Sequence, residues 1–187
     1  MTNKNEAAGK TLESTFIKQL CLMIGKKISQ IKVCEFGSWD GIHKSNIRDF
    51  VINGCHLGIF IESDEKKYKS LRKNYKNNEN TLLLNHFVGT SNEDNIDSIL
   101  LNNDISHLDF MSIDIDGNDY HVFDSLKKVC VDIICIEFNP TIPFDTDYVQ
   151  PNNSVLARGA SLLSFKKLGE KKGYTCLAVI GANVIFL

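Results

Sequence analysis

The sequence predicts an α/β fold, with a mostly parallel sheet of seven strands, helices on both faces and an antiparallel last strand. Short apolar runs alternate with segments whose apolar residues recur at helical spacing. Short connections between alternating strands and helices produce parallel strands flanked by helices. The last two apolar runs, residues 174–180 and 184–187, are separated by only three residues, and so short a connection requires antiparallel neighbours.

The chain is long enough to form one ordinary domain, with 187 residues of which 43% are hydrophobic. We predict a polar N-terminal tail and a leading helix within residues 1–30, and a single domain over residues 31–187. The leading helix covers residues 11–28, where apolar side chains recur every three or four positions. Covering one face of the sheet is its expected role.

The remaining elements follow from the same patterns of apolar residues, punctuated by glycine and polar turns. Predicted strands cover residues 31–36, 57–61, 81–88, 107–115, 131–138, 174–180 and 184–187. Predicted helices cover residues 42–53, 64–77, 93–103, 120–128 and 161–172, with Gly54 capping the first of them. Residues 139–159 lack periodicity and contain three prolines, which indicates an irregular substrate loop.

The composition argues against nucleic acid or a membrane as a partner. A net charge of −2 and a pI near 6.2 show no overall excess of basic residues, which nucleic acids and anionic membranes attract. The six cysteines show neither a Cys-x-x-Cys pair nor zinc-site spacing, which favours a reducing compartment. No apolar run approaches the roughly 20 residues of a transmembrane helix, so we expect a cytoplasmic protein.

The most informative stretch is residues 33–41, Val-Cys-Glu-Phe-Gly-Ser-Trp-Asp-Gly. We interpret it as a strand, a tight turn at Gly37 and Gly41, and the N-terminus of a helix, where free N–H groups attract anions. Glu35 adds a carboxylate that repels phosphate but suits a cation or hydroxyl. S-adenosylmethionine, an amino acid with a sulfonium, fits this mixture better than a dinucleotide. The alternative is that the two glycines only form a turn.

A second acid follows the next strand. Glu62 lies 25 positions after Gly37, about where doubly wound folds place an acid against a ribose diol. The two oxygens of a carboxylate can accept both hydroxyl protons. Alternatively, Glu62 only stabilises the N-terminus of the following helix.

More acids gather after the fourth and fifth strands. Asp114 and Asp116 point to one face if their strand persists, and Asp119 and His121 follow a glycine break. Glu137 ends the fifth strand. Acids grouped at the carboxyl edge of a sheet are costly unless they meet a cation, a proton or a ligand donor. The alternative is an aspartate-rich turn that caps the helix over residues 120–128.

Three of these features together resemble a known family. The segment 35–41, the acid Glu62 and the segment 112–120 resemble the first motif, the ribose acid and the fourth-strand motif of Rossmann-like class I S-adenosylmethionine-dependent methyltransferases. The FkbM-type and related sugar or macrolide O-methyltransferases are the most similar group. The resemblance covers residues 31–187, and the terminal hairpin is similar to the antiparallel seventh strand of that fold.

The resemblance implies a methyltransferase acting on a hydroxyl of a small molecule or sugar. It implies a cofactor site, in which Asp114 faces the methionine portion, and a magnesium site as in some related enzymes. The implied cofactor-binding residues are Glu35, Gly37, Ser38, Gly41, Glu62, Ser63 and Asp114; the implied magnesium ligands are Asp114, Asp116 and Glu137. Trp39 and Asp40 depart from the family pattern, which often has a small residue or asparagine followed by an apolar one.

An oxygen acceptor must lose its proton, and we predict Asp114, Asp116 and His121 as catalytic residues, with His43 as a further candidate base. So small a chain leaves acceptor recognition to the leading helix, the loop 139–159 or a second subunit, so a homodimer is one expectation. Two alternatives remain: an inactive methyltransferase-like binding protein, and a nicotinamide-dependent oxidoreductase. The latter is disfavoured because the glycines lack the Gly-x-Gly-x-x-Gly spacing.

Overall fold

The structure is a computed structural model that describes residues 12–152, 154 and 157–187. The predicted N-terminal tail lies outside these residues. The chain divides into two compact units, one comprising the residues up to Phe87 with His107–Ser112, and the other Val88–Ser106 with Ile113–Leu187.

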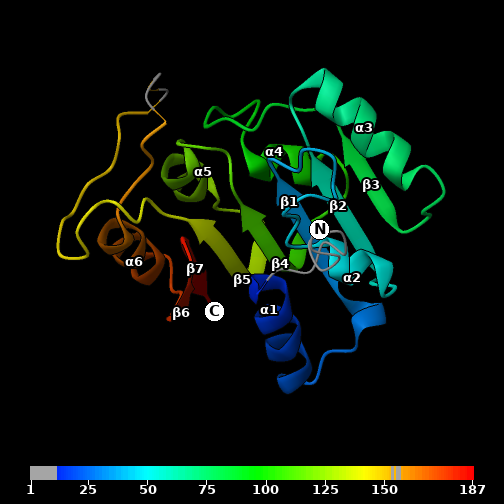
Figure 1. Cartoon of the computed structure of the whole chain (residues 1–187), viewed down its shortest axis with the longest axis horizontal. Helices are drawn as coiled ribbons and strands as arrows, with labels where there is room; N and C mark the ends of the chain where they lie inside the picture. The colour runs from blue at the N-terminus through cyan, green and yellow to red at the C-terminus, as the bar shows by residue number, and fades with distance from the viewer. Residues whose placement is uncertain (1–11, 153, 155–156) are drawn as a thin grey trace, which may run out of the picture. The chain divides into compact units, whose positions relative to one another are not determined.

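The predicted seven-stranded sheet is confirmed, with strand order β3-β2-β1-β4-β5-β7-β6 (Figure 1). The strands are β1 (Lys32–Phe36), β2 (Leu57–Ile61), β3 (Thr81–Leu84), β4 (His107–Ile113), β5 (Cys130–Glu137), β6 (Cys176–Ile180) and β7 (Asn183–Phe186). β1, β2 and β3 pair in parallel, whereas β7 is antiparallel to both β5 and β6. The last strand is therefore antiparallel, as its short connection requires.

The first unit carries helices α1 (Leu12–Met23), α2 (Arg48–Ile52) and α3 (Glu65–Tyr75), and a 3-10 turn at Ile28–Gln30. Aromatic pairs fill its core: the ring centroids of Phe50 and Phe110 lie 5.8 Å apart, and those of Phe60 and Tyr75 lie 4.6 Å apart. Phe60 belongs to β2 and Tyr75 to α3, so this second pair packs α3 against β2 (Figure 1).

The second unit carries α4 (Ile96–Leu101), α5 (Asp119–Ser125) and α6 (Leu162–Lys171). Phe123 of α5 stacks on Phe186 of β7, with centroids 5.9 Å apart. Gly169 lets α6 approach this cluster, because a Cβ there would lie 2.5 Å from the Phe186 ring. Buried Asp97 accepts hydrogen bonds from the backbone N–H groups of residues 127–129, which fixes the connection from α5 to β5.

Several predicted boundaries are wrong. The third strand, predicted over residues 81–88, ends at Leu84, and the helices predicted over residues 93–103 and 120–128 are shorter at one or both ends. The leading helix ends at Met23, because Gly25 takes a left-handed φ of 83°. The helix predicted over residues 42–53 begins only at Arg48, since Lys44 has a φ of 55° that a helix cannot contain. The fourth strand ends at Ile113 rather than residue 115. Among the described residues, none of the helices combines the length and apolar character needed to cross a bilayer.

Replacing Gly41 by alanine should destabilise the protein by about 1–3 kcal/mol more than replacing Gly54 by alanine. Both glycines are left-handed, with φ of 71° and 76°, so both variants carry the same backbone cost of about 1–2 kcal/mol. A Cβ at Gly41 would also lie 2.5 Å from Tyr75 and 2.6 Å from Leu71, whereas one at Gly54 meets nothing within 4 Å. Urea unfolding of both variants measures the difference; equal losses would contradict the packing at Gly41.

Candidate active site

The segment that follows β1, residues 37–47, is a loop that we call the glycine loop. The buried carboxylate of Glu35 holds it, accepting hydrogen bonds from Ser45 Oγ at 2.7 Å and from the Asn46 N–H at 2.6 Å. Asn46 in turn donates its side-chain amide to Ser112 Oγ at 3.0 Å. The predicted passage from the glycine turn directly into a helix N-terminus is therefore wrong, because Glu35 binds the chain in an irregular conformation up to α2.

The predicted cofactor residues of this loop have distinct environments. Gly37 is exposed, with a φ of 75°, and its backbone is open to a ligand. Ser38 is buried; its hydroxyl donates to the Glu35 carbonyl at 2.6 Å and accepts from the Ile61 N–H at 3.1 Å. Ser38 therefore joins the ends of β1 and β2, and Gly41 packs against α3. Their predicted cofactor contacts stay predictions.

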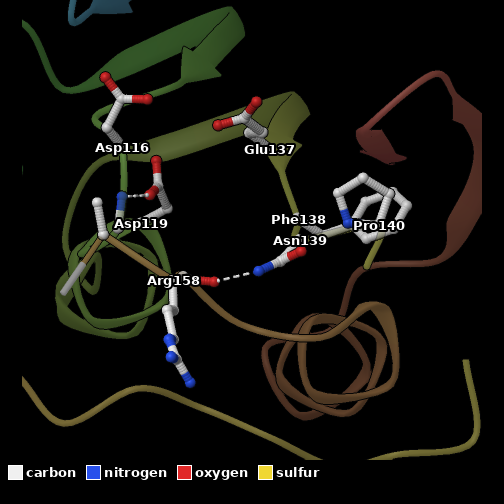
Figure 2. Close-up of a pocket in the computed structure, with 10 residues that line it drawn as sticks. Asp116, Asp119, Glu137, Phe138, Asn139, Pro140 and Arg158 are labelled. Atoms are coloured by element: carbon white, nitrogen blue, oxygen red, sulfur yellow. Dashed lines mark hydrogen bonds between the residues drawn. The ribbon is translucent and has the colours of Figure 1, made fainter. Parts of the chain in front are cut away.

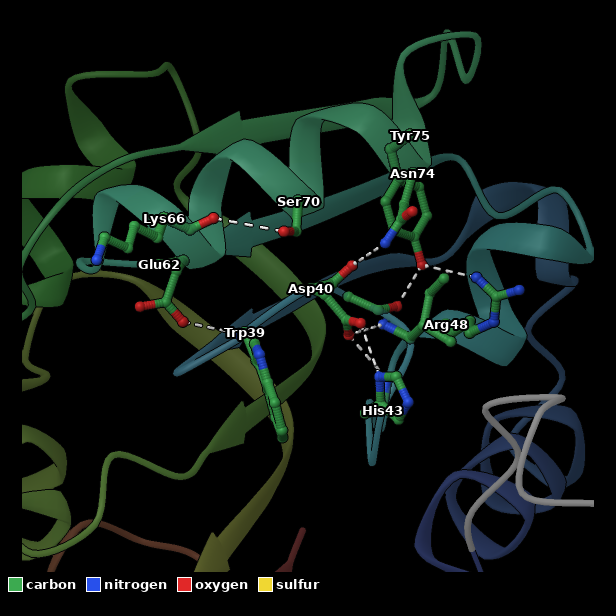
Figure 3. Close-up of polar contacts among 11 residues, drawn as sticks. Trp39, Asp40, His43, Arg48, Glu62, Lys66, Ser70, Asn74 and Tyr75 are labelled. Atoms are coloured by element: carbon green, nitrogen blue, oxygen red, sulfur yellow. Dashed lines mark hydrogen bonds and ion pairs between the residues drawn. The ribbon is translucent and has the colours of Figure 1, made fainter. Parts of the chain in front are cut away.

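Glu62, at the end of β2, is buried, and each of its carboxylate oxygens accepts a backbone hydrogen bond; Figure 3 shows the one with Trp39. One oxygen accepts the Trp39 N–H at 2.7 Å and the other accepts the Asp64 N–H at 2.8 Å. Asp64, not Glu62, caps α3, accepting the N–H groups of Lys66 and Lys67. Glu62 itself accepts the N–H of this capping residue, so its alternative role, stabilising the N-terminus of α3, stays open beside the ribose role. Ser63, between the two acids, is exposed.

Asp40 organises the outer part of the glycine loop. Its carboxylate accepts the N–H groups of Ile42 and His43 at 2.9 Å and contacts His43 Nδ1 at 2.7 Å (Figure 3). Partial burial acts to raise its pKa, but these hydrogen bonds outweigh it and lower the pKa of Asp40. The carboxylate therefore stays charged and holds the exposed ring of His43 in one orientation.

In the second unit, residues 114–119 form a turn that we call the acidic turn. One ligand oxygen from each of Asp114, Asp116 and Glu137 lies within 4.8 Å of the others. β4 ends at Ile113, before Asp114 and Asp116, and Asp116 has a left-handed φ of 55°. Glu137 is the last residue of β5. The turn, rather than the predicted alternation along a strand, brings them together. Burial, and then the charges of Asp114, Asp119 and Asp116, raises the pKa of Glu137 to about 7.

Asp119 differs from the other acids because it holds the turn itself. Its buried carboxylate accepts the N–H groups of Ile115 and Gly117, both at 2.8 Å. Burial raises the pKa of Asp119, although these hydrogen bonds oppose the shift. Asp119 therefore holds the turn rather than capping α5, whose N-cap residue, Asn118, makes no side-chain capping hydrogen bond. The predicted alternative, an aspartate-rich turn that caps this helix, does not describe Asp119.

His121 lies on α5 and contacts the Gln150 carbonyl through Nε2 at 2.7 Å. Because a carbonyl oxygen only accepts, Nε2 carries the proton in this arrangement, and Nδ1 is the nitrogen that could act as a base. The structure thus restricts the predicted catalytic role of His121 to Nδ1 without testing it.

The acidic turn borders a pocket of about 200 Å³ (Figure 2). The pocket lies between the acidic turn, the end of β5 and both ends of the predicted substrate loop; its lining residues are Asp116, Gly117, Asp119, Glu137, Phe138, Asn139, Pro140, Ala157, Arg158 and Gly159. Gln150 holds the part of the pocket lining formed by Arg158 and Gly159, since its buried side-chain oxygen accepts the N–H groups of both residues at 2.8 Å. Sequence reasoning missed Gln150, because an aperiodic segment carries no signal for a buried amide.

Comparisons with known proteins identify the fold. Residues 92–169, which include the acidic turn and the substrate loop, match the model of the methyltransferase FkbM domain. The structure of an O-methyltransferase from Bacillus cereus in complex with SAH matches with a TM-score of 0.59 and 16% identity, over 98% of this chain and 84% of that one. The chain has the class I S-adenosylmethionine-dependent methyltransferase fold. The resemblance inferred from the sequence is thereby confirmed.

Two further neighbours of this methyltransferase fold are longer than the chain. The CMeT domain of the citrinin polyketide synthase matches with a TM-score of 0.61 and 12% identity, over 93% of this chain and 50% of that one. The CurJ carbon methyltransferase matches with a TM-score of 0.59 and 11% identity, over 93% and 52%. The chain thus spans about half the length of each. A search of curated protein sequences found no match.

Replacing Glu137 by glutamine should stabilise the protein above pH 7, and the gain should vanish below pH 4.5. The folded-state pKa of about 7 exceeds the ordinary value of 4.5, so between these pH values the folded state binds more protons than the unfolded state. Raising the pH through this window therefore lowers the free energy of unfolding of the wild type. Thermal unfolding of both proteins across the window measures the effect, and a difference independent of pH would contradict it.

Proposed function

We propose that this protein is an S-adenosylmethionine-dependent methyltransferase that transfers a methyl group to a hydroxyl of a small molecule or sugar. The observation that carries the proposal is that carboxylate oxygens of Asp114, Asp116 and Glu137 lie close together beside a pocket, in a chain with the methyltransferase fold. Burial and the repulsion among these carboxylates raise the pKa of Glu137. A proton, a cation or a hydrogen-bond donor of a ligand would relieve this repulsion, and carboxylate oxygens accept hydroxyl protons. A pocket of about 200 Å³ favours a small acceptor.

The contacts of Glu62 fit the ribose of the cofactor. Each of its oxygens accepts one backbone N–H, from Trp39 or Asp64. A carboxylate oxygen has two lone pairs, so each oxygen keeps one position for a ribose hydroxyl. The two backbone groups fix the orientation of the carboxylate before the ligand arrives. When bound, S-adenosylmethionine supplies an electrophilic methyl group on its sulfonium.

Methyl transfer is an in-line displacement, so the main task of the chain is to align the acceptor with the methyl group. The acceptor hydroxyl must also lose a proton. Asp116 lines the pocket and can accept it. His121 is not among the described residues that line the pocket, and its Nδ1 is the second candidate. Glu137, with a pKa of about 7, is able to hold a proton near neutral pH.

The same three carboxylates fit a magnesium ion. Oxygen donors are the ligands that Mg²⁺ prefers, and the oxygens of Asp114, Asp116 and Glu137 already lie within 4.8 Å of one another. A bound cation would offset the repulsion among them and polarise the acceptor hydroxyl. We therefore include Mg²⁺ in the proposal as an ion held by these residues.

The alternatives are less well supported. A nicotinamide cofactor needs its pyrophosphate at a helix N-terminus, whereas the glycine loop continues until α2 begins at Arg48. A carbon acceptor fits the fold, since CurJ is a carbon methyltransferase, but gives no reason for grouped carboxylates. An inactive binding protein would not need them either.

Asp116→Asn should lower methyl transfer by about 10²–10⁴-fold, the range for loss of a general base. Incubation with methyl-tritiated S-adenosylmethionine and a panel of sugars, phenols, amines and carbon acids, with Mg²⁺ or with EDTA, measures transfer to each class of acceptor. Asp124→Asn is the matched control, because Asp124 is an exposed acid on α5 outside the pocket; it should retain wild-type activity within about twofold. Transfer to carbon or nitrogen acceptors alone would refute the hydroxyl assignment, and transfer to none of them would refute the function.

A further inference from the structure

Trp39, in the middle of the glycine loop, has a backbone conformation that its side chain does not favour. Its φ is 50°, in the left-handed region that glycine and asparagine occupy more readily than bulky residues. It is also the single tryptophan of the chain. Backbone geometry alone therefore does not account for a tryptophan at this position.

Hydrogen bonds on both sides keep the residue in place. The Trp39 N–H donates to the Glu62 carboxylate at 2.7 Å. The next residue, Asp40, accepts the Asn74 side-chain amide on its carbonyl at 2.9 Å, and its carboxylate holds the N–H groups of Ile42 and His43 (Figure 3). The backbone of residues 39 and 40 is thus held at separate points, which fixes the place in the loop from which the indole extends.

The ring does not belong to the hydrophobic core. Trp39 is 48% exposed, and its indole contacts two polar, exposed side chains. His43 lies 5.6 Å away between centroids at an interplanar angle of 32°, and Lys67 Nζ lies 5.7 Å from the ring centroid. The lysine is an exposed, flexible side chain that a ligand can displace. The loop therefore presents a half-exposed aromatic surface, outside the core, on the residue whose backbone N–H binds Glu62.

We propose that the indole of Trp39 packs against the nucleoside of the ligand whose ribose hydroxyls bind Glu62. The inference rests on the proposed function and names a further cofactor-binding and specificity residue. A diol bound to Glu62 lies next to the backbone of Trp39, because both use the same carboxylate. Stacking of a nucleobase on an aromatic side chain strengthens binding by about 5- to 150-fold. Trp39 thus adds selectivity for a purine nucleoside over another diol-bearing ligand.

Titration with S-adenosylhomocysteine tests the proposal, because emission from the single tryptophan reports on Trp39 alone. We expect the fluorescence to change along the same binding curve that calorimetry gives. Trp39→Asn keeps the backbone N–H for Glu62 and tolerates the left-handed φ, so it should remain folded and bind about 5- to 150-fold more weakly. Trp39→Phe, the matched control, keeps a flat aromatic face and should bind within about threefold of wild type.

The outcomes separate this inference from the proposed function. If wild type binds by calorimetry while the emission stays unchanged and Trp39→Asn binds equally well, the role of Trp39 is refuted and the function stands. If wild type does not bind S-adenosylhomocysteine, both are refuted. Thermal unfolding of each variant establishes that weaker binding does not arise from loss of the fold.

Discussion

The first unit depends on a buried charge, the carboxylate of Glu35 inside β1. A buried carboxylate is unfavourable unless hydrogen bonds compensate it, and the compensating groups come from Ser45 and Asn46, ten and eleven residues further along the chain. The glycine loop must therefore fold back over the end of its own strand. The positions of Gly41 against α3 and of Trp39 beside Glu62 follow from that path.

The acids of the two units are used differently. Glu35 and Glu62 each receive hydrogen bonds from the backbone, which fix them as acceptors at the ends of β1 and β2. Around Glu137, other carboxylates crowd the site and raise its pKa. Oriented acceptors suit a neutral diol, whereas crowded carboxylates suit a proton or a cation. This difference is consistent with the proposed roles: Glu62 in binding the cofactor, and the acids around Glu137 in the chemistry.

Local sequence patterns predicted the strands well, because each is an apolar run bounded by glycine or polar residues. The antiparallel end of the sheet followed from the short connection before β7. The glycine loop could not be predicted, because the Glu35 carboxylate accepts a hydrogen bond from the backbone N–H of Asn46, eleven residues further on. This contact overrides the helical spacing of apolar residues in 42–53. Residue type and strand position predicted that Asp114, Asp116 and Glu137 would lie together, as they do, whereas their functional roles stay predictions. The distinct role of Asp119, and the role of Gln150, depend on contacts that periodicity does not encode.

The central claim is that Glu62 anchors the ribose of S-adenosylmethionine. Its most direct test is calorimetric titration of wild type and Glu62→Ala with S-adenosylhomocysteine, with NAD titrated into wild type in parallel. The account predicts micromolar binding by wild type, loss of that binding in Glu62→Ala, and no heat from NAD. Equal binding by the two proteins, or binding of NAD in place of S-adenosylhomocysteine, would contradict it.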